Sequence, residues 1–134
     1  MTTELIDVAI IGGGPAGLTA AATLARQLHT AVVFDSGSYR NAPSAHMHMV
    51  PAWDHRDPAE FRAATKRDIL ARYAEFIKFE DIRVENIEKV GDAHFKVRDA
   101  SDENRDFRKI ILAVGSSNVF PDIKGYEDVW GKRM

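Results

Sequence analysis

Titratable side chains gather in one short stretch of the sequence. This stretch, residues 36–57, shows no regular period of apolar residues and contains His46, His48, Asp54 and His55. An imidazole titrates near neutral pH and is the usual general acid or base, while a neighbouring carboxylate can fix its tautomer. We therefore predict His46, His48 and Asp54 as catalytic residues for proton transfer. The alternative is that these histidines line a loop without reacting.

The spacing of the two leading histidines places them on one side of an extended segment. His46 and His48 would then point the same way, with Met47 pointing opposite. An H-x-H pair can bind a metal, but no third ligand follows at a metal-binding spacing. We predict no metal site.

A second group of residues has the spacing of an anion site. Gly12, Gly14 and Gly17 form a G-x-G-x-x-G pattern between the apolar run 8–11 and an alanine-rich stretch. In such a pattern the first glycine allows a tight turn, the second lets a pyrophosphate approach, and the third lets the helix lie close to the sheet. Pro15 suits the first helical turn, whose free N–H groups attract anions. A glycine-rich turn without a ligand is the weaker interpretation.

A carboxylate follows where a dinucleotide fold needs one. The apolar run Ala31–Phe34 predicts a second parallel strand, and Asp35 closes it eighteen positions after Gly17. In such folds an acid here hydrogen-bonds the adenosine ribose. Arg40 follows and could instead meet a phosphate, so this pattern leaves FAD, NAD and NADP open.

A helix and a strand-rich region complete the pattern. Asp57 caps a helix that begins at Pro58, and Glu60 is expected to reach back as in a capping box. Its core stripe is Phe61, Thr65, Ile69, Tyr73 and Phe76, and its solvated basic face is Arg62, Lys66, Arg67 and Arg72. Strands with turns at 91–92 and 101–104 predict an antiparallel meander, and Lys109–Val114 predicts another strand buried on both faces.

These elements predict an α/β fold, a Rossmann-like parallel sheet with a small antiparallel β-meander. The 134 residues, 45% of them hydrophobic, suffice for one core, so we predict one domain over 1–134 with a linker-like tail over 116–134. The net charge of −2 gives no reason to expect nucleic acid, and no apolar run is long enough for a membrane span. The chain contains no cysteine and shows no secretory signal, and we expect a cytoplasmic protein.

The motifs together resemble a known family. GGGPAG, a strand-end acid, a meander and AVG are similar to the FAD-binding half of thioredoxin-reductase-like flavoproteins. The stretch SGSYRNAPSAHMHMVPAWDHRDPAEFR is most similar to fungal dithiol oxidases of epidithiodiketopiperazine biosynthesis. The resemblance implies FAD contacts at Gly12, Gly14, Pro15, Ala16, Gly17, Asp35, Ser36, Arg40, Asn41, Ala113 and Gly115.

Departures from the family pattern concern the flavin end. Members continue into a pyridine-nucleotide domain with a C-x-x-C pair, and this sequence stops where that pair would be approached, which predicts an incomplete FAD-binding domain. Val114 replaces a Thr, Met49 an Asn and Ala52 a Gly of the family pattern. These replacements remove hydrogen-bonding groups or add bulk, so we expect a retained adenosine site and an eroded flavin end.

Three functions follow from these expectations. The first is a small-molecule enzyme of specialised metabolism that works by acid–base chemistry (isomerisation, dehydration or cyclisation), without flavin turnover and even without a cofactor. The second is an FAD-binding half of an oxidoreductase that holds flavin as a dimer or with a partner. The third is a non-catalytic accessory subunit. An uncovered sheet face favours a homodimer.

Overall fold

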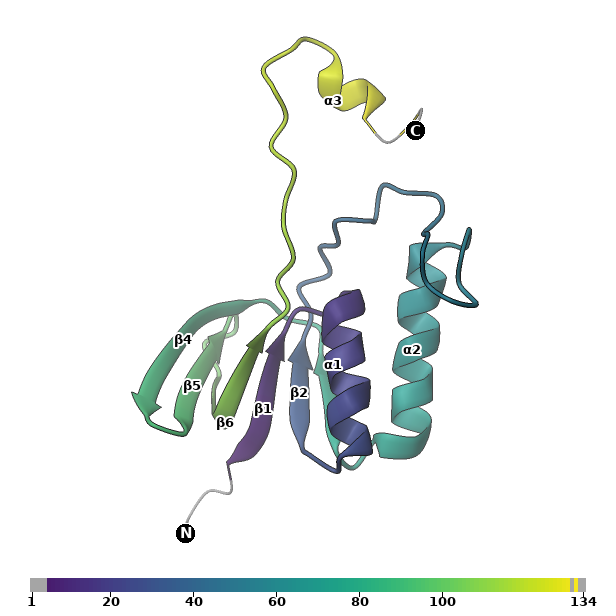
Figure 1. The fold of residues 1–134 in the computed structure, drawn as a ribbon. Helices are drawn as coiled ribbons and strands as arrows, with labels where there is room; N and C mark the ends of the chain where they lie inside the picture. Colours follow the sequence, from purple (N-terminus) through teal and green to yellow (C-terminus); the bar gives the residue numbers. More distant parts are fainter. Residues whose placement is uncertain (1–4, 131, 133–134) are drawn as a thin grey trace.

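The computed structural model, which describes residues 5–130 and 132, contains one six-stranded sheet with the strand order β3-β2-β1-β6-β5-β4 (Figure 1). The elements are β1 (Ile6–Ile11), α1 (Pro15–Arg26), β2 (Ala31–Phe34), α2 (Pro58–Tyr73), β3 (Ile77–Glu80), β4 (Val84–Gly91), β5 (His94–Asp99), β6 (Asn104–Leu112) and α3 (Tyr126–Val129). β3, β2, β1 and β6 are parallel, whereas β4, β5 and β6 form an antiparallel meander. The predicted α/β fold is confirmed.

The helices cover one face of the parallel strands. Val8 and Ile10 of β1 belong to a buried cluster with Ala21 and Ala25 of α1 and with Ile69 of α2. The alanines keep α1 close to the sheet because their side chains add little thickness. A separate cluster on other strand positions includes Phe34 and Phe107, whose rings meet edge to face with centroids 5.9 Å apart.

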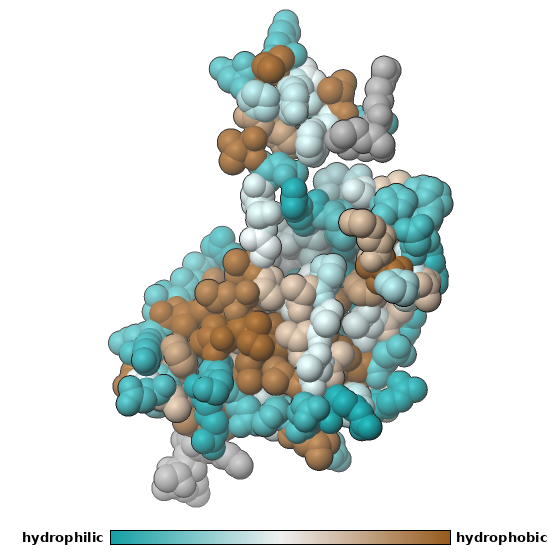
Figure 2. Space-filling view, viewed as in Figure 1, coloured by the Kyte–Doolittle hydropathy of each residue, from teal (hydrophilic) through white to brown (hydrophobic). Residues whose placement is uncertain are grey.

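The structure corrects the strand predicted at Lys109–Val114. β6 begins earlier, at Asn104, and ends at Leu112, so the segment around Phe107 belongs to the same strand. The predicted run 109–114 is not buried on both faces, since Leu112 at the end of β6 and Val114 just past it are each 67% exposed. The strand joins the parallel strands to the meander, and its residues Ile110 and Ile111 are half-buried. Figure 2 shows apolar side chains gathered over the strands beside α1.

The start of α2 confirms one predicted cap and corrects another. The Asp57 carboxylate accepts hydrogen bonds from the backbone N–H groups of Ala59 and Glu60, at 2.6 and 3.4 Å. The Glu60 carboxylate, however, lies 3.5 Å from the Arg56 guanidinium. An ion pair with this basic neighbour therefore replaces the predicted reach back to the cap.

After β6 the chain leaves the sheet and then forms the short helix α3 (Figure 1). Within this tail the rings of Phe120, Tyr126 and Trp130 gather with centroids 5.4 to 6.0 Å apart. The linker-like character of 116–134 stays a prediction. Over the described residues, no helix is both long and apolar enough to cross a membrane.

Candidate functional site

We call residues 12–17, which comprise the turn after β1 and the first residues of α1, the glycine turn. Backbone contacts leave no space for side chains at two of its glycines. Gly12 has a left-handed backbone with φ of 119°, and its N–H donates to the carbonyl of Phe34 at 2.9 Å. A Cβ at Gly12 would overlap the carbonyl oxygen of Ala113, and a Cβ at Gly17 would overlap the carbonyl oxygen of Gly12. Both glycines are therefore required by packing, as the pattern predicts.

Gly14 differs from its neighbours because it faces open space. A Cβ there would have no heavy atom within 4 Å, apart from its chain neighbours and the helix's own backbone. Gly14 is the N-cap of α1, Pro15 is the first helical residue and Ala16 is exposed; in the described chain no side chain caps this end. The N–H groups of the first turn therefore keep the capacity to bind an anion.

Asp35 lies beside the glycine turn at the carboxyl edge of the sheet. Its N–H donates to the carbonyl of Glu80 at 2.9 Å, which fixes the backbone as β2 ends. A Cβ at Gly13 would overlap the Asp35 carboxyl group, so the two segments are in direct contact. The structure thus brings together the two signals that the sequence separates by eighteen residues.

The Asp35 carboxylate has two partners in the following loop. It accepts hydrogen bonds from the Gly37 N–H at 2.9 Å and from the Tyr39 hydroxyl. Burial and this bond to Asp35 raise the pKa of Tyr39 to about 12. Ser36, which precedes Gly37, is exposed, and its hydroxyl accepts weakly from the Ser38 N–H at 3.4 Å.

Side chains from α2 and the tail hold the remainder of this loop. The Arg62 guanidinium lies 3.7 Å from the centre of the Tyr39 ring and donates to the Asn41 side chain at 3.1 Å. Arg62 therefore does not belong to a solvated basic face. Arg40, the candidate phosphate ligand, donates instead to the Asn118 side chain at 3.3 Å.

Two predicted cofactor residues follow β6, and one of them, Ala113, contacts the glycine turn. The Ala113 N–H donates to the carbonyl of Ile11 at 2.8 Å, and its own carbonyl packs against Gly12. Gly115 has a left-handed backbone with φ of 66°, and a Cβ there would meet nothing within 4 Å. Both residues stand at the same sheet edge as Gly14 and Asp35. Gly13 and Arg62 are residues of this site outside the predicted set.

The predicted catalytic residues are brought together in a second region, the histidine loop (residues 46–57). The His46 and His55 rings stack with centroids 4.0 Å apart, and the His48 and His55 centroids are 5.6 Å apart. The His48 Nδ1 lies 3.2 Å from the Asp54 Oδ1. A hydrogen bond from the Met49 N–H, then the bond to His48, hold the pKa of Asp54 below its usual value.

The shape of the histidine loop depends on one narrow bridge. The Met47 N–H donates to the carbonyl of Arg56, and the His55 N–H donates to the carbonyl of Met47, each at 2.7 Å. Met47 is 7% exposed, whereas Met49 is 94% exposed. Met49, Ala52 and His55 have left-handed φ angles of 64°, 64° and 60°. These backbones are strained because none of the three residues is a glycine.

The histidine–aspartate pair is open to solvent. The side chains of His48 and Asp54 are 58% and 68% exposed. Such a pair can accept or donate a proton, but it does not exclude water from a reacting molecule. In the described part of the chain, no group of three or more His, Asp or Glu side chains could hold a metal ion.

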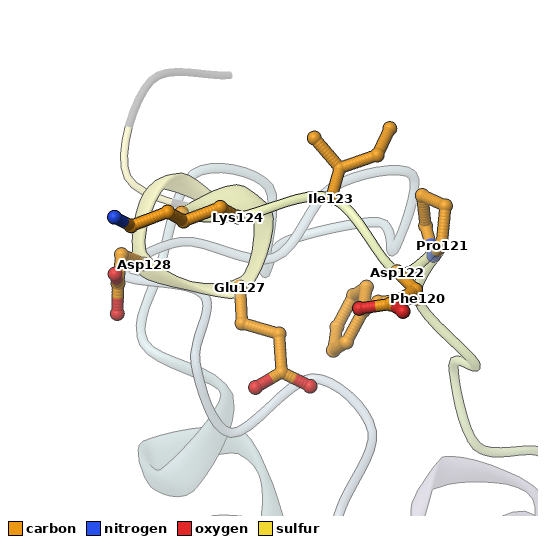
Figure 3. Close-up of a pocket in the computed structure, with 8 residues that line it drawn as sticks. Phe120, Pro121, Asp122, Ile123, Lys124, Glu127 and Asp128 are labelled. Carbon is orange, nitrogen blue, oxygen red and sulfur yellow. The ribbon is translucent and has the colours of Figure 1, made fainter.

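The two tryptophans pack in different parts of the chain. Trp53 packs against Phe61 and under the Arg56 guanidinium, whereas Trp130 lies in the tail cluster. One open hollow of about 410 Å³ is lined by tail residues 120–125, 127 and 128, and Figure 3 shows Ile123 and Glu127 pointing to opposite sides of this segment. A second hollow of about 490 Å³ lies between α1 and α2. Neither is lined by the glycine turn or the histidine loop.

Known proteins similar to this chain share both its sequence and its fold. Residues 6–134 match the family described as pyridine nucleotide-disulphide oxidoreductase. Thioredoxin reductase tcpT of Claviceps purpurea is 44% identical over 99% of this chain, and thioredoxin reductase aclD of Aspergillus oryzae is 42% identical over all of it. The chain spans only 41% and 42% of the length of these two relatives.

A solved structure confirms the fold. The oxidoreductase from Agrobacterium tumefaciens superposes with a TM-score of 0.88 at 32% identity, over 96% of this chain and 42% of that protein. The resemblance to the FAD-binding half of thioredoxin-reductase-like proteins is therefore confirmed, both in sequence and in overall fold.

Proposed function

Because the chain belongs to the pyridine nucleotide-disulphide oxidoreductase family, we propose that it binds FAD through the ADP half of that cofactor. In this role it is the FAD-binding part of a thioredoxin-reductase-like oxidoreductase of specialised metabolism. One observation carries the proposal: Gly14 opens onto free space between two glycines that backbone contacts require. Packing within the chain does not require the free space at Gly14, which lies beside a helix end that no side chain caps.

The residues of this chain fit the two polar parts of ADP. The N–H groups of the first turn of α1 are suited to pyrophosphate, and the Asp35 carboxylate is suited to ribose hydroxyls. Ala113 and Gly115 adjoin the turn, and the small size of both leaves room for a ligand to pass along the sheet edge. When bound, FAD would supply two-electron transfer, a chemistry that amino-acid side chains lack.

Titration of the purified chain with FAD tests this proposal. We expect flavin fluorescence to change with a stoichiometry of one per chain and ADP to compete with FAD for the site. Gly14→Ala should weaken both ligands while the fold is kept, and Gly125→Ala, in the tail, should leave binding as it is. Failure of FAD and ADP to bind at millimolar concentration would contradict the proposal.

A second function is favoured by the contact between His48 and Asp54. At 3.2 Å the carboxylate can fix the imidazole tautomer, the arrangement used for general acid–base chemistry on a small molecule without flavin turnover. His48→Ala should then lower turnover by at least about tenfold. His29→Ala, at the far end of α1, is the matched control. Unchanged turnover, together with co-purification of a protein partner, would favour an accessory subunit instead.

Self-association follows from the apolar surface beside β6. Leu112 and Val114 are each 67% exposed, and unpaired apolar area of this kind favours a homodimer. Light scattering at micromolar concentration should give twice the mass of one chain. The mass of a single chain would contradict this expectation.

A further inference from the structure

We infer that Tyr39 is a positioning residue that holds the Asp35 carboxylate in the orientation that accepts ribose hydroxyls. The inference rests on the proposed binding of an adenine dinucleotide. It assigns a role to a side chain outside the glycine pattern, and it explains why an aromatic residue stands four positions after the acid.

Both oxygens of Asp35 are held, yet neither is saturated. The Oδ1 accepts from the Gly37 N–H at 2.9 Å, and the Oδ2 accepts from the Tyr39 hydroxyl. A carboxylate offers about four lone-pair positions, so about two remain for a ligand. A ribose offers two neighbouring hydroxyl groups. The carboxylate is thus fixed in rotation and can still accept both hydroxyls.

Tyr39 is itself fixed by a side chain from a helix. The Arg62 guanidinium stacks 3.7 Å from the ring centre, and its Nη1 donates to the Asn41 Oδ1 at 3.1 Å. Asp35, Tyr39, Asn41 and Arg62 thereby form one connected group that joins the end of β2 to α2. Stacking with a guanidinium leaves the hydroxyl free to bond Asp35.

The hydroxyl remains a donor over the whole neutral range. Burial, and then the neighbouring Asp35, raise the pKa of Tyr39 to about 12. A protonated phenol next to an ionised carboxylate makes a charge-assisted hydrogen bond, which is stronger than a neutral one. Without this bond Asp35 would keep only the Gly37 N–H, and a ligand would have to order the carboxylate on binding.

Isothermal titration calorimetry with ADP and 2′,3′-dideoxy-ADP separates positioning from a general structural role. We expect the wild-type chain to prefer ADP, because only ADP has the ribose hydroxyls. Tyr39→Phe keeps the ring under Arg62 but removes the hydroxyl. It should reduce the preference by about tenfold, the effect of one charge-assisted hydrogen bond, and leave dideoxy-ADP affinity as in wild type. Tyr73→Phe, on α2, is the matched control.

The outcomes are distinct. An unchanged preference in Tyr39→Phe, or an equal loss for both ligands, would overturn the inference while the proposed function stands. A wild-type chain that binds neither ligand would overturn both. If Tyr39→Phe does not fold, Arg62→Met decides the question. It removes the stacked guanidinium, and a retained preference for ADP would again overturn the inference.

Discussion

The glycine turn and the histidine loop lie near the same edge of the sheet, but they are built in opposite ways. In the glycine turn, Gly12 takes the left-handed backbone and Gly17 the close helix contact, so each demanding position carries the residue that suits it. In the histidine loop, Met49, Ala52 and His55 take left-handed backbones that favour glycine.

The two regions also differ in what surrounds them. The glycine turn contacts Phe34 and Asp35 at the end of β2 and Ala113 just past the end of β6. The histidine loop is held by its own narrow bridge at Met47, and Met49 is 94% exposed. The comparison teaches that the glycine turn has a glycine at each position where its backbone requires one, whereas the histidine loop is a strained surface loop. The predictions below test this contrast.

Gly17→Ala, in the glycine turn, should lower the free energy of unfolding more than any other variant considered below. Its Cβ would overlap the Gly12 carbonyl oxygen, which belongs to the backbone and cannot move aside. We expect the free energy of unfolding to fall by about 3 kcal/mol, measured by urea denaturation. Gly14→Ala faces open space and should change stability by less than about 0.5 kcal/mol while ADP affinity falls at least about tenfold. Equal stabilities of the two variants would refute the packing argument.

Asp35→Asn should weaken ADP binding. The amide keeps the shape but loses the charge that strengthens hydrogen bonds from ribose hydroxyls. The expected cost is about 2 kcal/mol, or about thirtyfold in the dissociation constant, measured by calorimetry. Asp81→Asn, an exposed acid just past β3, is the control. An affinity equal to wild type would remove Asp35 from the site.

Ala52→Gly should stabilise the protein, in contrast to any substitution of Gly12. Ala52 has φ of 64°, where a Cβ is strained, and we expect a gain of about 0.5–1 kcal/mol in the free energy of unfolding. Ala63→Gly, at an exposed position of α2, should instead cost about 1 kcal/mol. If both variants lose stability, the histidine loop is not strained at this residue.

Alkaline titration should single out Tyr39 among the tyrosines. Its folded pKa of about 12 lies above the ordinary value of 10.0, so its contribution to stability is complete below pH 10 and is lost as the pH rises through 12. Ultraviolet detection of tyrosinate should show one late transition, absent in Tyr39→Phe. In Asp35→Asn this transition should move to lower pH, since the negative partner is gone. A late transition that survives in Tyr39→Phe would assign it to another tyrosine.

His48→Ala should have the smallest effect on nucleotide binding. The side chain is 58% exposed and its partners Asp54 and His55 both belong to the histidine loop, so ADP affinity and stability should match wild type within about 0.5 kcal/mol. Loss of ADP affinity in this variant would show that the two regions are coupled.

The glycine turn and the position of Asp35 were predictable because the sequence patterns that indicate them are local. The spacing of Gly12, Gly14 and Gly17, with Asp35 closing the next strand, fixes a βαβ unit, and the structure places these residues together. Gly13 could have been found from the unbroken run of three glycines. No pattern in the sequence indicates that Arg62 belongs to the site, because its contact with Tyr39 depends on how α2 packs against a loop 23 residues earlier in the chain.

The exposed end of β6 could not be predicted for a different reason. An apolar run such as Lys109–Val114 indicates what a strand is suited to bury, not which elements cover it, and in the described part of the chain Leu112 and Val114 are each 67% exposed. The stacking of His46 on His55 likewise depends on the turn made by Met49 and Ala52. Non-glycine residues give no local indication of such a backbone.

Mapping ADP onto the backbone amides by NMR tests the central claim most directly. The account predicts that ADP shifts the amide signals of residues 12–14, 16–17 and 35–39, while those of the histidine loop and of α3 stay in place. Shifts confined to residues 46–57, or an ADP titration that moves no amide signal of the glycine turn, would contradict it.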